Sequence, residues 1–381
     1  MAVYKIFPTQ DATIYSLFPT MNTGLDEIVE ATTTAFGFDN PNPQTSRFLM
    51  QFSPTDIDNI ITQKIGDKTW DAHLRCFIST VTGLNTDTTI EAWPLAKTWD
   101  NGTGRYLDNP LTTDGTSWIW NTYDGDSQWL SNIPANATSS YTSSVYPGGG
   151  IWYTGSTNTF HPDVSASQTY ALYNEFDLNL GVTDIVHNWY SSSIGATGLP
   201  NYGFIVKQAS NEEFIYNTDQ QIEIKYFSID TNTIYPPQLE FRWEDFIYNT
   251  GSSTQTIVNT PQVYASLANN PGTFYSESVQ RFRLNVRPQF PPIIFQTSSV
   301  YTTNYYLPTA SYYAIQDLDT NLYVVEFDST YTKISADVSS SYFDVYMNGL
   351  EPQRLYKILL QTTIDGTTLV LDNNYTFKVV N

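Results

Sequence analysis

The sequence predicts an all-β protein, and three observations support that prediction. Tyr, Phe and Thr suit pleated, half-buried strands, and the 381 residues include 28 Tyr and 21 Phe. Charged residues make up only 14% of the chain, against roughly 25% in typical soluble proteins. Apolar and polar residues alternate through short segments that Pro and Gly clusters separate. Because one core stops growing near ~250–300 residues, we expect two domains.

The first expected domain covers residues 1–247. Alternation places Phe48, Met50 and Phe52 on one face of a strand, and it does the same for Leu74 and Cys76 in the next. The segments 221–229 and 238–243 show the same pattern. Only one helix is clearly predicted, over 181–192, where apolar residues recur at i, i+3, i+4 and i+7. Segment 54–66 is a shorter second candidate.

Residues 103–168 differ from the rest of this domain, because they hold few apolar alternations and many aromatic side chains. We interpret them as a long loop inserted into the β scaffold. Loops longer than ~12–15 residues are usually functional or disordered, and this one is too aromatic to be plain disorder. The aromatic residues of interest are Trp118, Trp120, Tyr123, Trp129, Trp152 and Tyr153.

Residues 248–274 are polar and read as a linker, and 275–381 read as a second, immunoglobulin-like β-sandwich. Within this domain Arg281, Arg283 and Arg287 line the polar face of a strand. They form either an ordinary exposed face or a docking strip for an acidic neighbour.

The charge excludes several classes of function. A net charge of −21 argues against nucleic acid and anionic membranes, because both need clustered Lys and Arg. Residues 1–250 carry most of the acidity, with 28 Asp and Glu against 10 Lys and Arg. The single cysteine, Cys76, excludes an intramolecular disulfide. The N-terminus has no apolar signal region and no segment is long enough to span a membrane, so we expect synthesis in a cytoplasm without export by a signal peptide.

The first domain resembles the DNRLRE-type, carbohydrate-binding-module-like jelly rolls. The resemblance rests on DATIYSLFPTMNTG at 11–24, SRFLMQFS at 46–53, the segment TIEAWPLAKTWDNGTG, VTDIVHNWY at 182–190, NYGFIVK at 201–207 and PPQLEFRW at 236–243. These occur in the family's order over roughly 1–247. The resemblance implies a jelly-roll sandwich that binds or scaffolds. In the second domain, LEPQRLYKILLQT is similar to a fibronectin type III corner, in which Tyr356 is the corner tyrosine.

Nothing in the sequence indicates catalysis. The three histidines are far apart, and no nucleophile elbow, phosphate loop or dinucleotide motif is present. A glycosidase pair of carboxylates depends on spacing that a sequence does not reveal. We expect no cofactor. A structural calcium ion is the one alternative, with Asp124, Asp126 and Gln128 as candidate ligands, because jelly-roll modules of this kind often hold calcium. Following the resemblance, Asp11 and the pair at 26–27 are further candidates, and plain solvated turns are the competing interpretation.

The aromatic insertion has three interpretations: a sugar-stacking site, a contact with a neighbouring subunit, or a loop packed on its own domain. We favour the subunit contact. The expected function is that of a non-enzymatic structural protein in a tailed-phage virion, in the neck, tail, baseplate or capsid decoration, since modular β-domains without disulfides resemble such proteins. Other virion proteins and further copies of the chain are the expected partners. A carbohydrate-binding adhesin or receptor-binding module is the alternative.

Overall fold

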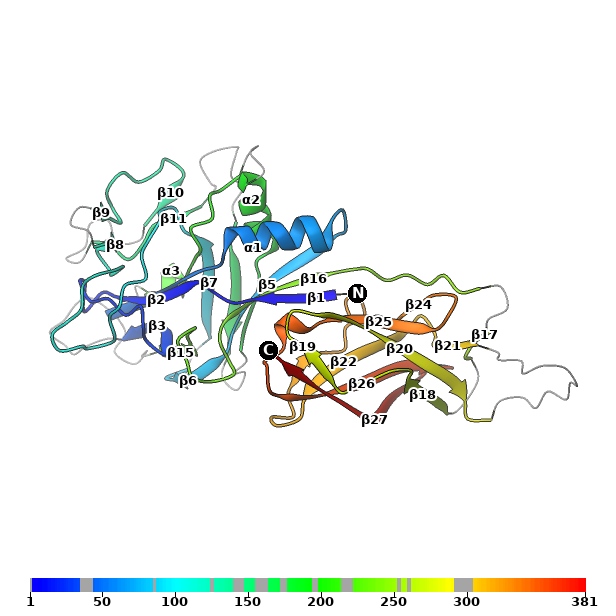
Figure 1. Cartoon of the computed structure of the whole chain (residues 1–381). Coiled ribbons are helices and arrows are strands. Elements are labelled where there is room, and N and C mark those ends of the chain that lie inside the picture. Colours follow the sequence, from blue (N-terminus) through cyan, green and yellow to red (C-terminus); the bar gives the residue numbers. More distant parts are fainter. Residues whose placement is uncertain are drawn as a thin grey trace, which may run out of the picture. The chain divides into compact units, whose positions relative to one another are not determined.

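The computed structural model describes residues 2–34, 44–84, 87–123, 127–139, 147–154, 164–171, 177–193, 198–213, 222–251, 255–258, 262–290 and 304–381 (Figure 1). Strands form most of the regular structure, so the predicted all-β fold is confirmed. The chain divides into two compact units. The N-terminal unit comprises Ile6–Gly66 and Asp71–Glu240, and the C-terminal unit comprises Met1–Lys5, Asp67–Trp70 and Phe241–Asn381.

An eight-stranded sheet forms the main layer of the N-terminal unit. Its strands are β2 (Gln10–Tyr15), β3 (Ile28–Thr34), β4 (Gln44–Gln51), β6 (Ile78–Thr82), β7 (Thr88–Pro94), β12 (Ala166–Tyr170), β14 (Phe204–Gln208) and β15 (Ile222–Phe227). The order is β12-β7-β14-β4-β3-β15-β6, and β2 pairs with β4. Every residue of β4 except Gln51 is buried, which agrees with its central place in the sheet.

The second layer of this unit contains β5 (Trp70–Cys76) and β13 (Leu178–Gly181), which pair antiparallel. Burial alternates along β5, and Leu74 and Cys76 point inward as predicted. Two further strands, β1 (Ala2–Ile6) and β16 (Gln238–Trp243), are divided between the units. Residues 2–5 of β1 and 241–243 of β16 are assigned to the C-terminal unit.

The predicted helix over 181–192 is confirmed as α2 (Thr183–Ser193). Its Ile185, Val186 and Trp189 are buried, so the spacing of the apolar residues correctly predicted which face of the helix packs on the core. The shorter candidate forms α1 (Pro54–Asn59), continued by a π-helical turn, η1 (Ile60–Ile65). The Ser53 hydroxyl caps α1 by accepting the Asp56 N–H at 3.2 Å. A third helix, α3 (Ser210–Glu213), is a single turn.

The insertion is built from short strands and turns: β8 (Trp120–Thr122), β9 (Ser127–Gln128), β10 (Ala137–Thr138) and β11 (Trp152–Tyr153). These pair two by two, β8 with β9 and β10 with β11. The expected insertion, 103–168, also includes the first three residues of β12, a strand that belongs to the main sheet and pairs with β7.

Two sheets form the C-terminal unit. Its strands are β17 (Gln255–Thr256), β18 (Val263–Leu267), β19 (Thr273–Tyr275), β20 (Val279–Pro288), β21 (Tyr305–Tyr306), β22 (Ser311–Asp317), β23 (Tyr323–Val325), β24 (Ser335–Ala336), β25 (Ser341–Tyr346), β26 (Leu355–Ile364) and β27 (Thr367–Val380), with a 3₁₀ turn, η2 (Met347–Gly349). One sheet has the order β17-β21-β20-β25-β24, with β18 added on β20, and the other has the order β19-β27-β26-β22-β23.

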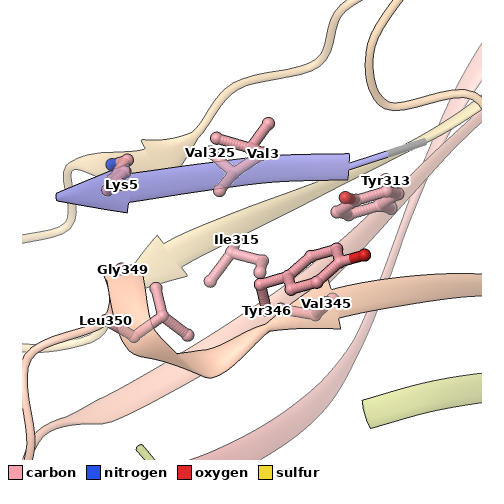
Figure 2. Close-up of a pocket in the computed structure, with 9 residues that line it drawn as sticks. All are labelled: Val3, Lys5, Tyr313, Ile315, Val325, Val345, Tyr346, Gly349 and Leu350. Atoms are coloured by element: carbon pink, nitrogen blue, oxygen red, sulfur yellow. The ribbon is translucent and has the colours of Figure 1, made fainter. Parts of the chain in front are cut away.

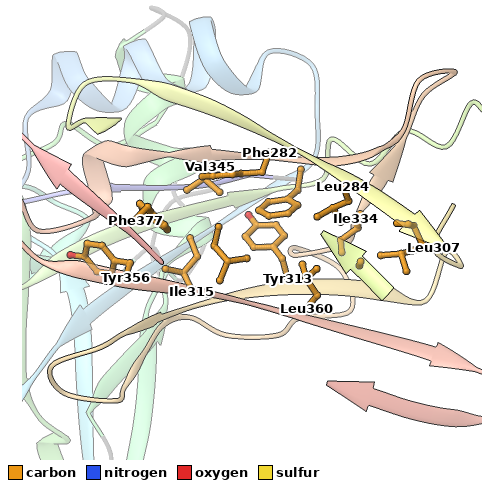
Figure 3. Packing of buried hydrophobic residues seen from close by; sticks show 14 of the residues in the cluster. Phe282, Leu284, Leu307, Tyr313, Ile315, Ile334, Val345, Tyr356, Leu360 and Phe377 are labelled. Atoms are coloured by element: carbon orange, nitrogen blue, oxygen red, sulfur yellow. The ribbon is translucent and has the colours of Figure 1, made fainter. Parts of the chain in front are cut away.

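Both sheets contribute aromatic side chains to the core between them (Figure 3). Tyr313 stacks on Phe343 with ring centres 4.4 Å apart, and Phe343 stacks on Phe282 at 5.4 Å. The stretch expected as a linker contributes β18, whose Val263 and Ala265 also belong to this core. The alternation of apolar residues in β18 is short, and the polar residues before and after the strand conceal it in the sequence.

The predicted tyrosine corner is present. Tyr356 is buried at the start of β26, and its hydroxyl donates to the carbonyl of Glu351 at 3.0 Å, five residues upstream. This bond fixes the turn into the strand, as corner tyrosines do in sandwiches of this type.

Residues 2–5 of β1 belong to the C-terminal unit, although they are distant from it in sequence. The Lys5 ammonium donates to the carbonyl of Val324 at 3.2 Å, and Asn348 Nδ2 donates to the carbonyl of Lys5 at 2.8 Å. Figure 2 shows Val3 and Lys5 lying over the residues that line a small apolar cavity. This cavity measures about 10 Å³, which is room for one water molecule at most.

Candidate functional site

The structure places four of the six aromatic residues singled out in the insertion inside the N-terminal unit. Trp118, Trp129, Trp152 and Tyr153 are all buried. The Trp129 indole N–H donates to the carbonyl of Ser117 at 2.9 Å. These side chains are therefore not on the surface, and for them the structure favours a loop packed on its own domain.

An arginine beneath the insertion explains this burial. Arg47 of β4 is fully buried and forms a bidentate ion pair with Glu213 of α3, with Nε–Oε1 at 2.8 Å and Nη2–Oε2 at 2.6 Å. Its guanidinium carbon lies 5.3 Å from the ring centre of Trp118 and 5.2 Å from that of Trp152. The Arg47 side chain also donates to the carbonyl of Gly149. The tryptophans thus cover a buried charge and stabilise it through cation–π contacts.

Only two of the six aromatic residues reach solvent. Tyr123 is 43% exposed and Trp120 is half-buried, and their rings meet edge to face at 5.7 Å. These two side chains are the accessible part of the predicted partner or glycan contact.

The predicted arginine strip is largely neutralised within its own unit. Arg281 forms a bidentate pair with Asp344, with both distances 2.8 Å, and Arg283 does the same with Asp337 at 3.0 and 2.8 Å. The hydrogen bonds from Arg283 lower the pKa of Asp337 to about 2. An acidic partner would have to compete with these internal carboxylates.

The third arginine of the strip has a different contact. The guanidinium of Arg287 lies over the ring of Tyr264, with its carbon 5.0 Å from the ring centre. Arg287 is exposed, so its guanidinium is open to a neighbour on the side away from Tyr264.

The calcium candidates are only partly described. Asp124 and Asp126 lie outside the described residues, and Gln128 is exposed on β9. Asp11 is buried and accepts the N–H of Ile229 at 2.8 Å, and this burial raises its pKa to about 7. In the described part of the chain, no group of three His, Cys, Asp or Glu side chains could hold a metal ion.

Within the described residues, the remaining reactive side chains do not come together. Cys76 is a buried free thiol whose pKa is raised by that burial. His73 lies 3.1 Å from Asn179, His187 is exposed on α2, and His161 is outside the described residues. In the described residues, no helix is long and apolar enough to cross a membrane.

A polar cleft that the sequence did not predict opens on the main sheet of the N-terminal unit. It has a volume of about 190 Å³ and is lined chiefly by β2, β3, β4 and β15. The side chains that give it its chemical character are Tyr15, Phe18, Glu30, Tyr106, Glu223 and Lys225.

Strand register brings the charged residues of the cleft together. Lys225 of β15 is directly opposite Glu30 of β3, and Glu223 is two residues before Lys225 on the same face. The Lys225 Nζ lies 3.1 Å from Glu30 Oε2 and 3.7 Å from Glu223 Oε2. Burial opposes the charge on Lys225, but Glu30, Glu223 and Tyr106 together outweigh it and raise the lysine pKa.

Aromatic side chains form one wall of the cleft. Tyr106, which is 47% exposed, lies with its ring centre 5.1 Å from that of Tyr15 and 6.1 Å from that of Phe18. The Tyr15 hydroxyl donates to Glu30 Oε1. Burial, reinforced by Glu30, raises the pKa of Tyr15, so this hydroxyl stays protonated as a donor. The cleft therefore combines carboxylates, one ammonium group and an open aromatic face.

Comparison with known proteins adds no family. No protein-family model matches the chain, and no curated protein sequence matches it. The resemblance to DNRLRE-type jelly rolls therefore stays a prediction.

Proposed function

We propose that this chain is a non-enzymatic structural protein of a tailed-phage virion, in the neck, tail, baseplate or capsid decoration. It acts through contacts with other virion proteins and assembles as a homo-oligomer in the particle. The observation that carries the proposal is the cleft, a recess on the main sheet whose aromatic wall offers the side chains that are enriched at protein interfaces. The composition supports the same proposal, because only 14% of the residues are charged and most of these are acidic. The β-sandwich fold with a single cysteine supports it too.

The cleft is better suited to binding than to glycoside hydrolysis. A glycosidase holds its two carboxyl groups in contrasting environments, so that one is an acid while the other is a base or nucleophile. Here Glu30 and Glu223 share one cation, Lys225, and Glu30 also accepts the Tyr15 hydroxyl. A shared cation does not separate the two carboxylates into an acid and a base.

Mass spectrometry of purified particles from the source tests the proposal directly. We expect the chain at a fixed copy number per particle, and cryo-electron microscopy should locate it. Its absence from purified particles would refute a virion role. Light scattering of the purified protein, with and without EDTA, tests both self-association and the calcium alternative.

A carbohydrate-binding adhesin or receptor-binding module is the second candidate, and the exposed Tyr123 beside Trp120 favours it. Aromatic rings offer sugars an apolar face with little conformational entropy to lose. A glycan panel screened with the full chain and with Tyr123→Ala tests this candidate. Tyr275→Ala, which removes a 69% exposed tyrosine of the C-terminal unit, is the matched control. Equal glycan binding by both variants would remove the Tyr123 and Trp120 site.

A further inference from the structure

The cleft on the N-terminal unit carries an excess of negative charge. Glu30 and Glu223 face one ammonium group, that of Lys225. Behind the aromatic wall, the Asp26 carboxylate accepts the backbone N–H of Tyr106 at 3.0 Å. After the larger effect of burial, Glu30, Glu223 and Asp26 raise the pKa of Tyr106, and Lys225 alone among its neighbours opposes them. The local field therefore favours a positive ligand group.

One carboxylate is open to a second cation. Glu223 has a side chain 38% exposed, and its Oε2 receives the Thr82 hydroxyl at 3.3 Å and the more distant Lys225. Among the described residues, its Oε1 receives no hydrogen bond that meets normal geometry. Because a carboxylate has about four acceptor positions, Glu223 retains capacity for a charged donor.

The size of the cleft restricts the ligand. At about 190 Å³ it is below the ~300–1,000 Å³ of sites that bury drug-sized molecules, so it suits one side chain or one sugar ring. An anionic ligand would meet two carboxylates against one ammonium. A planar cation meets an open tyrosine ring and a carboxylate, which are the two partners that a guanidinium group prefers.

We propose that this cleft binds an arginine side chain of a partner protein, with its guanidinium stacked on Tyr106 and paired with Glu223. This inference rests on the proposed function, because it names the partner chemistry of a protein that works through protein contacts. The acidity of residues 1–250, 28 Asp and Glu against 10 Lys and Arg, would speed association with a basic partner surface.

Saturation-transfer difference NMR on the full chain tests the proposal, since it detects weak ligands of a 43.1 kDa protein. The probes are a capped Gly-Arg-Gly tripeptide, the same peptide with neutral citrulline in place of arginine, and methyl pyranosides. We expect saturation of the arginine methylenes and at least about fivefold weaker binding of the citrulline peptide, as the loss of one charge-assisted contact implies.

Variants localise the signal. Tyr106→Ala and Glu223→Gln should each weaken arginine binding about fivefold or more, while Tyr106→Phe retains the ring and most of the binding. Tyr323→Ala is the matched control, because it removes a tyrosine of similar exposure, 44% against 47%, from the C-terminal unit. Thermal unfolding verifies that each variant is folded.

Three outcomes would overturn the inference: equal binding of the citrulline peptide, no binding of the arginine peptide, or binding unaffected by Tyr106→Ala and Glu223→Gln. A signal from a methyl pyranoside alone that depends on Tyr106 would overturn it too, and would make the cleft a sugar site. The particle experiment remains independent, because a virion protein found in particles can still fail to bind arginine here.

Discussion

Removing the carboxylate beneath the aromatic insertion should destabilise the N-terminal unit severely. Glu213→Ala leaves Arg47 as a buried charge without its bidentate partner, and both side chains are 0% exposed. Breaking a buried ion pair on one side typically costs about 3–5 kcal/mol, because the remaining charge is neither paired nor hydrated. The cation–π contacts with Trp118 and Trp152 remain and offset part of this cost, so we expect about 3 kcal/mol.

Urea unfolding followed by tryptophan fluorescence provides the assay, because the insertion contains three buried tryptophans, Trp118, Trp129 and Trp152. The matched control is Asp344→Ala, which breaks the Arg281 pair and leaves behind an arginine whose side chain is 47% exposed. Exposed pairs contribute only about 0–1 kcal/mol, so the control should shift the midpoint little. Each variant is compared with the parent protein at an equal unfolding slope.

A second variant separates charge burial from lost packing. Replacing both partners, with Arg47→Met and Glu213→Leu, should recover much of the stability lost in Glu213→Ala, since no unpaired charge is left. If Glu213→Ala costs no more than Asp344→Ala, then the ion pair does not support the insertion and our explanation of the buried tryptophans is wrong.

Three further predictions concern other parts of the chain. Tyr356→Phe removes the hydrogen bond from the hydroxyl to the Glu351 carbonyl and should destabilise the C-terminal unit by about 1 kcal/mol in urea unfolding; an unchanged urea midpoint would refute the corner role. Asn22→Ala should lower the free energy of unfolding by about 3 kcal/mol or more in the same assay. The Asn22 amide group donates to two carbonyls at 2.7 and 2.9 Å, and its side-chain oxygen accepts two backbone N–H groups. A loss below about 1 kcal/mol would contradict this. Asp11 binds its proton more tightly in the folded state, where its pKa is about 7 instead of 3.8, so the free energy of unfolding should fall as pH rises from about 4 to 7. Asp11→Asn should flatten this dependence of stability on pH, and an unchanged dependence would exclude Asp11 as its source.

Local pattern predicted the elements well. The spacing of Val182, Ile185, Val186 and Trp189 identified α2, and all four side chains are buried. These predictions succeeded because the periodicity of a helix or strand is a pattern among residues that are close in the sequence. The tyrosine corner was predicted from the fibronectin type III resemblance, and it too is local, since Tyr356 and Glu351 are five positions apart.

The sites depend on contacts between distant residues, which the sequence alone does not reveal. Trp118 and Trp152 have the composition of a surface contact, and only the position of Arg47 beneath them shows that they cover a buried charge. The cleft was missed because Glu30 and Lys225 are paired by the register of β3 and β15. Alternation shows that Glu223 and Lys225 point the same way, but it does not show which strand lies beside them.

The placement of β1 has a consequence for biosynthesis. Lys5 makes its backbone bond with Asn348, 343 positions later, so β1 is translated long before the strands it packs on. At ~5–20 residues per second this delay lasts tens of seconds, during which the apolar side of β1 has no partner in the C-terminal unit. A fragment starting at Phe241 would lack this strand permanently and leave the side chains of Ile315 and Val345 in the apolar cavity uncovered. Separate production of the complete C-terminal unit therefore requires both 1–5 and 67–70 to be supplied in addition to the fragment.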